Sequence, residues 1–173
     1  ERLFALLMQA AGRAGRDAAY SQASGQGSEM WVQTEHPAHP LFEALKRHDY
    51  PGFAASQLAE RQAAGLPPYA HLALLRAESR ALPAAIAFLQ DAAAALQADP
   101  ALAQWAAHVT CYPAVPAAMQ RLAGMERAQI LLESPRRAAL QGLLAGWQAA
   151  LHALRARHKA VLRWAIDVDP LSF

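Results

Sequence analysis

Residues 128–168 read AQILLE SPRRAALQGLLAGWQAALHALRARHKA VLRWAIDV, the pattern of a strand, a helix and a second strand. Ser134 followed by Pro135 is typical of a helix start, because serine caps helices and proline fits the first turn. Residues 161–168 alternate, which predicts a strand with Leu162, Trp164, Ile166 and Val168 on one side and Arg163 and Asp167 on the other. The helix is expected to bury an apolar stripe of Leu140, Leu143, Leu144, Trp147, Leu151 and Leu154.

The residues before this stretch extend the pattern. Residues 71–78 have the composition of a strand, and residues 82–98 have apolar positions at helical spacing. A short strand is expected at 108–112, then a crossing interrupted by two prolines, then a short helix at 117–122. The order βαββαβ predicts an α+β, ferredoxin-like domain whose two helices cover one face of an antiparallel sheet. The other face is then available to a partner domain or a ligand.

The N-terminal third has a different organisation. Residues 2–12 predict a helix that ends at glycines, and residues 17–28 predict a polar loop. Residues 29–34 have the composition of a short strand. Two further helices are expected, one from Pro40 through Leu45 and one over 49–64, where Phe53 and Leu58 mark the apolar side.

The sequence Gly65-Leu-Pro67-Pro68 stops the last of these helices. We therefore place a domain boundary there, between residues 1–66 and residues 67–173. Three tryptophans occupy apolar faces and are expected in the core: Trp31, Trp147 and Trp164.

Composition excludes several classes of protein. The single cysteine, Cys111, rules out an internal disulfide and a cysteine-rich zinc site, and it reads as a small buried hydrophobe. No apolar run is long enough to span a bilayer and no leader opens the chain, so a cytoplasmic protein is expected. The net charge of +2 is too small to indicate nucleic-acid binding by itself. His36 and His39 have a spacing that metals use, but no third ligand is evident, and we predict no metal site.

A second informative stretch is Gln9-Ala-Ala-Gly12-Arg13-Ala-Gly15-Arg16. Guanidinium groups beside a glycine-bearing turn suit a phosphate, because their planar fork matches phosphate oxygens. The alternative is a helix C-terminus with Gly12 or Gly15 in a left-handed cap and the arginines favoured by the helix dipole. The chain contains no phosphate-cradling G-x-x-x-x-G-K-[ST] loop.

This stretch resembles motif VI of the superfamily 2 helicases, which lies on the second RecA-like lobe and contacts ATP held by the first. The chain would then carry half of an ATP site and belong to a larger enzyme. Further phrases resemble, in order, the C-terminal region of the primosomal protein N-prime (PriA) family of replication-restart helicases. They are Val32-Gln-Thr with His39-Pro40, Arg47-His-Asp-Tyr-Pro-Gly-Phe53, Glu60-Arg-Gln-Ala-Ala-Gly-Leu-Pro-Pro-Tyr69 and Arg163-Trp-Ala-Ile-Asp-Val-Asp-Pro170.

The resemblance implies a function for the longer protein. It would be an ATP-dependent 3′–5′ DNA helicase of the bacterial cytoplasm and nucleoid, which recognises stalled forks and restarts replication by primosome assembly. ATP with Mg²⁺, and zinc bound by residues upstream, would serve that protein, whereas this fragment alone is expected to be inactive and to hold no cofactor. Residues 1–66 would end the second RecA-like lobe, and residues 67–173 would form a domain similar to a small-subunit ribosomal protein. The alternative is a non-catalytic α+β module that binds DNA or single-stranded DNA-binding protein.

The resemblance also assigns roles to individual residues of the motif. Arg16 matches the arginine finger that stabilises charge on the transferred phosphoryl group, and Arg13 matches a companion phosphate contact or interlobe coupling residue. Gln9 matches the glutamine that senses the nucleotide or the attacking water. Gly12 and Gly15 would let the backbone approach the nucleotide closely.

Two basic groups match partner-binding surfaces of the family. Arg137 and Gln141 are one turn apart and would bind the acidic C-terminal tail of single-stranded DNA-binding protein. A second group would contact the phosphates of forked and single-stranded DNA: Arg155, Arg157, Lys159 and Arg163. For both groups a solvated surface is an equal alternative. Other primosome proteins would be further partners. The phrase Gly124-Met-Glu126-Arg127 departs from the more basic family pattern, which puts DNA binding by that loop in doubt.

Overall fold

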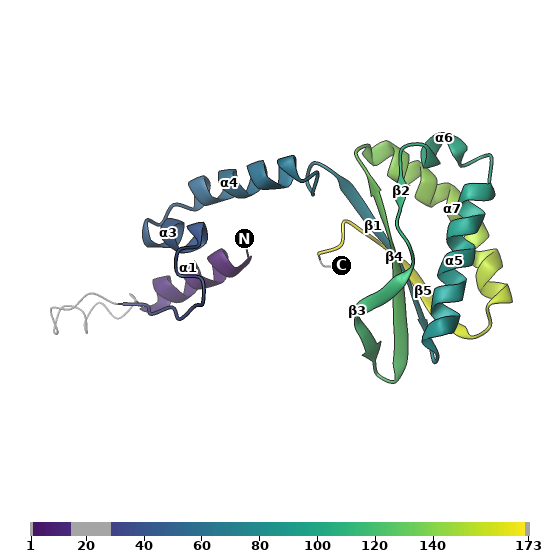
Figure 1. Ribbon diagram of the computed structural model, residues 1–173, viewed down its shortest axis with the longest axis horizontal. Coiled ribbons are helices and arrows are strands. Elements are labelled where there is room, and N and C mark those ends of the chain that lie inside the picture. Colours follow the sequence, from purple (N-terminus) through teal and green to yellow (C-terminus); the bar gives the residue numbers. More distant parts are fainter. Residues whose placement is uncertain (1, 15–28, 172–173) are drawn as a thin grey trace. The chain divides into compact units, whose positions relative to one another are not determined.

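The computed structural model describes residues 2–14 and 29–171 and is drawn in Figure 1. The chain divides into two compact units, Glu1–Ala64 and Gly65–Phe173. The predicted polar loop over 17–28 lies outside the described residues, as do Gly15 and Arg16.

The described part of the first unit is helical. It contains α1 (Arg2–Ala14), α3 (Pro40–Lys46) and α4 (Tyr50–Ala63). Both later helices start at a side-chain cap: Nδ1 of His39 accepts from the amide of Leu41 over 3.1 Å, and Asp49 accepts from the amide of Gly52 over 2.9 Å. A small core joins the three helices and is formed by Phe4, Leu41, Ala44, Leu45 and Phe53.

The N-terminal helix differs from its prediction. It continues through Gly12 to Ala14, because Gly12 keeps a helical conformation and neither ends the helix nor adopts a left-handed cap. The cap alternative is therefore wrong for Gly12. Phe4 holds the helix in place: its ring stacks on that of Phe53, with centroids 4.9 Å apart and planes 12° apart.

Three further expectations for this unit are wrong. Residues 29–34 are irregular rather than a strand, since no strand of the described part of the unit is there to pair with them. Trp31 is 90% exposed, so it is not a core residue. Leu58 of α4 is exposed, although it was expected to face inward. Phe53, the other residue expected on that side, is buried.

The second unit is an α+β domain built on a five-stranded antiparallel sheet. The strands follow the order β2-β4-β1-β5, and β3 also pairs with β4. Its elements are β1 (His71–Ser79), α5 (Leu82–Ala98), α6 (Ala103–Ala106), β2 (Thr110–Cys111), β3 (Val115–Leu122), β4 (Met125–Ser134), α7 (Arg137–Arg157) and β5 (Val161–Val168).

Helices α5 and α7 pack side by side on one face of this sheet (Figure 1). All six residues of the predicted α7 stripe are buried, as expected. Trp147 is completely buried, and its Nε1 donates to the carbonyl oxygen of Ala92 on α5 over 3.1 Å. Alternate small and large residues of the two central strands complete the core: Ala73, Leu75 and Ala77 from β1, with Ala128, Ile130 and Leu132 from β4.

The predicted helix at 117–122 is wrong, because these residues belong to β3. Ala123 and Gly124 both have positive φ, 50° and 77°, which is the conformation of a tight hairpin turn. The turn folds β3 back onto β4 and overrides the local helix propensity of alanine, methionine and leucine. The register shifts between Pro116 and Arg121, so pairing is regular only near the two ends of β3. The expected four-stranded order therefore gains a fifth strand.

The last strand follows its predicted alternation only in part. Trp164 and Ile166 pack against the core, but Leu162 and Val168 are 51% and 38% exposed. The pairing register of β1 with β5 shifts between Glu78 and Ser79. Val161, which pairs with Ser79 after this shift, is buried. At the start of β5, Val161 rather than Leu162 thus joins the core, while Val168 at the other end leaves it.

Candidate functional site

The structure brings together two residues of the predicted nucleotide motif. Gln9 and Arg13 are exposed, and they lie one turn apart on the same side of α1. Arg13 is in the last turn, where the helix dipole favours a positive charge. A Cβ added to Gly12 would meet nothing within 4 Å, so no neighbouring atom crowds this position. Gly15 and Arg16 lie outside the described residues.

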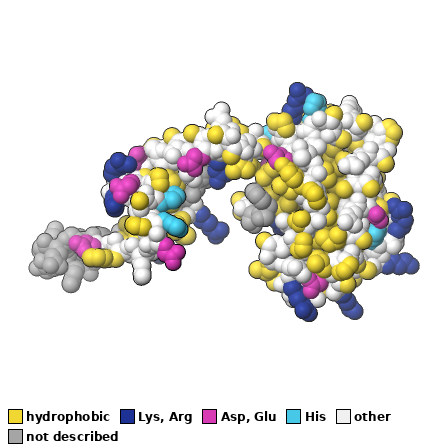
Figure 2. Space-filling view, viewed as in Figure 1, with side chains coloured by type: hydrophobic (Ala, Val, Ile, Leu, Met, Phe, Trp, Pro, Cys, Tyr) yellow, Lys and Arg dark blue, Asp and Glu magenta, His cyan; other side chains and the backbone are white. Residues whose placement is uncertain are grey.

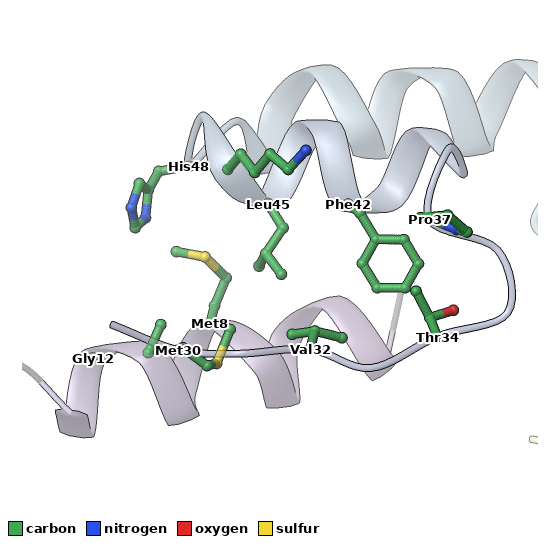
Figure 3. Close-up of a pocket in the computed structure, with 11 residues that line it drawn as sticks. Met8, Gly12, Met30, Val32, Thr34, Pro37, Phe42, Leu45 and His48 are labelled. Carbon is green, nitrogen blue, oxygen red and sulfur yellow. The ribbon is translucent and has the colours of Figure 1, made fainter. Parts of the chain in front are cut away.

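A pocket of about 560 Å³ lies on another side of the same helix. Figure 3 shows side chains of α1, the segment before α3, and α3 itself pointing toward one space. Gln9 and Arg13 do not line it. Sequence reasoning missed this pocket, because its walls come from three separate segments: Met8, Ala11, Gly12, Met30, Val32, Thr34, Pro37, Phe42, Leu45, Lys46 and His48.

The start of α7 presents the predicted peptide-binding pair. Arg137 and Gln141 are both exposed and one turn apart. Neither α6 nor α7 contains an acidic residue. Nη1 of Arg136 lies 3.1 Å from Nε2 of His108, which fixes a second guanidinium beside Arg137. This end of α7 is thus a basic surface suited to an anionic group.

A contact that the sequence analysis missed lies on the same helix. A Cβ added to Gly142 would lie 2.7 Å from Cε2 of Trp105, and one added to Gly146 would lie 2.5 Å from Cδ2 of Leu102. The short helix α6 therefore lies directly against the backbone of α7 at two glycines. The spacing Gly142-x-x-x-Gly146 was the signal in the sequence that could have indicated a close approach.

The end of α7 and the turn after it carry three of the four residues predicted to contact DNA. Arg157 and Lys159 are exposed. Arg155 is half-buried, and its Nη1 donates to the carbonyl oxygen of His158 over 3.3 Å. The ring of His158 is held in turn by Asp91, with Nε2 and Oδ2 2.8 Å apart. Arg155 thus helps to shape the turn, while Arg157 and Lys159 face solvent.

The fourth predicted residue, Arg163, lies on the opposite face of the sheet. It pairs across β5 and β1 with Glu78, whose carboxylate forms an ion pair with Arg127 of β4 at 3.3 Å. A second ion pair on this face joins Arg76 to Asp167 at 3.1 Å. Sequence reasoning missed Arg76 and Arg127, whose alternation with buried residues along their strands was the available signal.

Hydrophobic side chains gather over the front of the second unit, across β2, β3 and β4, while Lys and Arg lie toward its margins (Figure 2). Exposed apolar residues on β3 include Val115, Met119 and Leu122, and Tyr112 follows β2 directly. The Tyr112 hydroxyl donates to Oε2 of Glu133 over 2.7 Å, and this bond raises the pKa of Tyr112.

In residues 2–14 and 29–171, no three His, Cys, Asp or Glu side chains are grouped so as to hold a metal ion. The Cys111 side chain is half-buried rather than fully buried, and burial raises the pKa of its thiol. No helix in the part of the chain that the structure describes is long and apolar enough to cross a membrane.

Comparison with known proteins identifies the family. Residues 62–171 match the family model described as the primosomal protein N C-terminal domain, which covers nearly all of the second unit. The chain belongs to this family. Its primosomal protein N domain therefore comprises the sheet, the covering helices α5 and α7, and both basic ends of α7.

Curated relatives of this chain carry the name replication restart protein PriA. The protein of Haemophilus influenzae is 35% identical over 170 residues, which cover 98% of this chain and 21% of that protein. The protein of Rickettsia felis is 29% identical over 177 residues, which cover 100% of this chain and 24% of that protein. The protein of Synechocystis is 43% identical over 76 residues, covering 44% of this chain. The chain thus spans about a fifth to a quarter of the relatives that it matches along its whole length.

Proposed function

We propose that this chain is the C-terminal part of an ATP-dependent 3′–5′ DNA helicase of the bacterial cytoplasm. The longer protein would recognise stalled replication forks and restart replication through primosome assembly. The observation that carries the proposal is the match of 98% of this chain to the PriA protein of Haemophilus influenzae. Because the chain covers 21% of that relative, the activity is assigned to the longer protein, and the chain alone is inactive.

The first unit is the end of the second RecA-like lobe in this proposal. Two features support it. Leu3 and Leu6 on α1 are 52% and 56% exposed, as they would be after loss of a covering layer. Residues 29–34 have the composition of a strand but pair with no strand in the described part of the unit. Exposed leucines and an unpaired strand-like segment are both expected when only part of a sheet domain is present.

The exposed side of α1 is the nucleotide-facing surface in this proposal. Gln9 and Arg13 would contact ATP held with Mg²⁺ by the other lobe, and Arg16 would follow them in the chain. Bound ATP supplies the phosphoryl group whose transfer drives unwinding. A guanidinium keeps its charge at any physiological pH, so Arg13 can hold a phosphate oxygen throughout the reaction. Gly12 has open space beside it, which permits a close approach. Zinc would bind to residues outside this chain.

The decisive experiment replaces Arg16 in the longer protein. Arg16→Ala removes the positive charge expected at the γ-phosphate, so DNA-stimulated ATP hydrolysis is expected to fall by several orders of magnitude. Fork binding is expected to change little. Arg2→Ala is the matched control, because Arg2 is an exposed arginine of α1 outside the motif. Normal ATP hydrolysis by Arg16→Ala would remove this residue from catalysis.

The second unit is a ferredoxin-like domain with one added strand in this proposal. What supports it is the strand order β2-β4-β1-β5 with the helices α5 and α7 on one face. The added strand β3 extends the edge at which β2 also pairs with β4. The face opposite the helices carries the ion pairs of Arg76 and Arg127 and is available to a partner domain or DNA.

The start of α7 is the site for the acidic C-terminal tail of single-stranded DNA-binding protein in this proposal. An arginine beside a carboxamide suits a peptide carboxylate, and no acidic residue of α6 or α7 opposes it. Arg137→Glu in the longer protein is expected to weaken tail binding measured by calorimetry. Unchanged affinity would contradict the site. Other primosome proteins would bind elsewhere on the longer protein.

Forked and single-stranded DNA would contact the basic residues Arg155, Arg157, Lys159 and Arg163 through phosphates. Arg157 and Lys159 are exposed, so a phosphate can reach them, and this supports the role for these two residues. Arg163 lies on the other side of the sheet from the helices, so it would contact a different part of the DNA.

A second candidate function is a non-catalytic module that binds DNA or a protein. The specific observation in its favour is that the family match, 62–171, excludes the nucleotide motif. The sequence upstream of Glu1 separates the two candidates. A phosphate-binding glycine loop there would support the helicase, whereas its absence would leave the module.

A further inference from the structure

We propose that Phe4 is a positioning residue for ATP hydrolysis by the longer protein. Its contact with Phe53 sets the orientation of α1 and therefore the places of Gln9 and Arg13. Phe4 itself does not touch the nucleotide. This inference rests on the nucleotide-contacting role proposed above for Gln9 and Arg13, and it adds the residue through which the first unit holds them.

Opposite sides of α1 carry the packing contacts and the motif. Phe4 is 1% exposed and is the one buried side chain among residues 2–13, the part of the helix for which the structure describes side chains. Successive residues of an α-helix are rotated by about 100°, so Gln9 and Arg13 lie about 140° and 180° around the helix from Phe4. Both are exposed. The packed side of α1 therefore determines the direction in which the motif faces.

The half of α1 that carries the motif is packed less tightly. Leu7, Met8 and Ala11 are only half-buried, and Met8 and Ala11 border the pocket of about 560 Å³. Figure 3 shows Met8 and Leu45 pointing toward this open space from α1 and α3. A helix with few buried contacts on one side has less to resist its movement there. Packing at Phe4 therefore holds α1 more firmly than packing beside the motif does.

Phe4 rests on two rings at the start of α4. Its ring stacks on that of Phe53, with centroids 4.9 Å apart and planes 12° apart, and its centroid lies 5.5 Å from that of Tyr50. Asp49 caps this turn by accepting from the amide of Gly52 over 2.9 Å, and a Cβ on Gly52 would clash with the same carboxylate. The two rings thus project from a turn whose backbone is fixed by its cap.

A small movement at Phe4 becomes a larger one at the motif. An α-helix rises about 1.5 Å per residue, so Arg13 lies about 13 Å along the axis from Phe4. A tilt of about 10° at the ring stack would move Arg13 by about 2 Å. Misplacing a catalytic group by about 1 Å can slow a reaction by about a hundredfold. Loss of the stack is therefore expected to slow ATP hydrolysis although every group that touches ATP is still present.

The test measures DNA-stimulated ATP hydrolysis by the longer protein. Phe4→Leu keeps an apolar side chain but removes the stacked ring, and it is expected to lower kcat by about ten- to a hundredfold. KM for ATP is expected to change little, because the other lobe holds the nucleotide. Phe53→Leu removes the other ring of the stack and is expected to have the same effect, which provides a second test if Phe4→Leu does not fold.

Leu41→Ala is the matched control. Leu41 belongs to the same small core but contributes no ring to the stack. Its truncation is expected to lower thermal stability at least as much as Phe4→Leu does, with kcat unchanged. An equal loss of kcat in Leu41→Ala would mean that any weakening of this core slows hydrolysis, and the positioning role of Phe4 would be overturned.

A double-mutant cycle distinguishes positioning from the proposed function. Because Phe4 acts through Arg13, Phe4→Leu is expected to lower kcat less in the Arg13→Ala protein than in the wild type. Fully additive losses would refute the role of Phe4, as would normal kcat for Phe4→Leu beside impaired Arg13→Ala, and in both cases the nucleotide role of Arg13 stands. Normal kcat for Arg13→Ala would refute the nucleotide role, and the positioning role with it.

Discussion

Nε1 of Trp147 donates to the carbonyl oxygen of Ala92 over 3.1 Å, joining α7 to α5 inside the core of the second unit. Trp147 is also the largest fully buried side chain of the described residues. One side chain thus provides both packing volume and a polar link between the two helices that cover the sheet.

Replacing this tryptophan should destabilise the second unit. Trp147→Phe removes the hydrogen bond and leaves a cavity, so the free energy of unfolding is expected to fall by about 1–3 kcal/mol. Urea denaturation followed by circular dichroism measures the change. Trp31→Phe is the control, because Trp31 is 90% exposed and its replacement is expected to have no effect. Equal stability of the two variants would show that the buried contact contributes little.

The turn between β3 and β4 should respond in opposite directions to two neighbouring changes. Gly124 has φ of 77°, so Gly124→Ala is expected to lower stability by about 1 kcal/mol. Ala123 has φ of 50°, so Ala123→Gly is expected to raise stability by about 0.5–1 kcal/mol. Thermal denaturation of the two variants checks the signs. A loss of stability in both would mean that the left-handed conformation at Ala123 is not strained.

The phenol of Tyr112 should lose its proton at a higher pH than an ordinary tyrosine does. Its hydrogen bond to Glu133, together with the negative charge of that carboxylate, raises the pKa of Tyr112. Because the folded state holds this proton more tightly, the pair stabilises the fold below the unfolded pKa of about 10, and the effect is lost as pH rises through the higher folded value. Ultraviolet absorbance at high pH follows the titration. Glu133→Gln is expected to lower the pKa of Tyr112, and an unchanged titration would contradict this cause.

Fork binding should become less sensitive to salt when exposed cations at the end of α7 are removed. Arg157→Ala and Lys159→Ala are each expected to reduce the slope of log K against log salt by about 0.7–0.9, the value for one lost phosphate contact. Anisotropy with labelled forked DNA at several salt concentrations provides the slopes. Lys46→Ala is the control, since Lys46 is exposed but forms an ion pair with Glu43 at 2.7 Å. An unchanged slope in both test variants would leave α7 out of the DNA interface.

The two covering helices could be predicted because their signal is local. The leucines of α7 and the apolar positions of α5 recur at the helical period within a single segment, and both helices were found where that period indicates. β1, β4 and β5 were equally visible, since each has buried residues between turn signals. These elements carry enough periodic positions to determine their own structure.

The rest depends on contacts between distant residues. Residues 117–122 of β3 are good helix formers, and only pairing with β4 and the turn at Ala123 make them part of a strand. The short helix α6 has too few residues to show a period, so Trp105 could not be predicted as the partner of Gly142, even though the two glycines of α7 indicate a close approach. The ion pair of Arg127 with Glu78 likewise requires the register of two strands that are far apart in sequence.

The interrupted register of β3 has a consequence for behaviour at high concentration. β3 pairs with β4 on one side, and no strand of the described residues pairs with its other side. An open strand edge bearing Val115, Met119 and Leu122 would ordinarily invite a second molecule to add a strand and begin aggregation. Pro116 lacks an amide proton and the ladder is irregular up to Arg121, so this edge offers no continuous template. This edge of the unit is therefore a poor template for strand addition by a second copy, although apolar side chains lie along it.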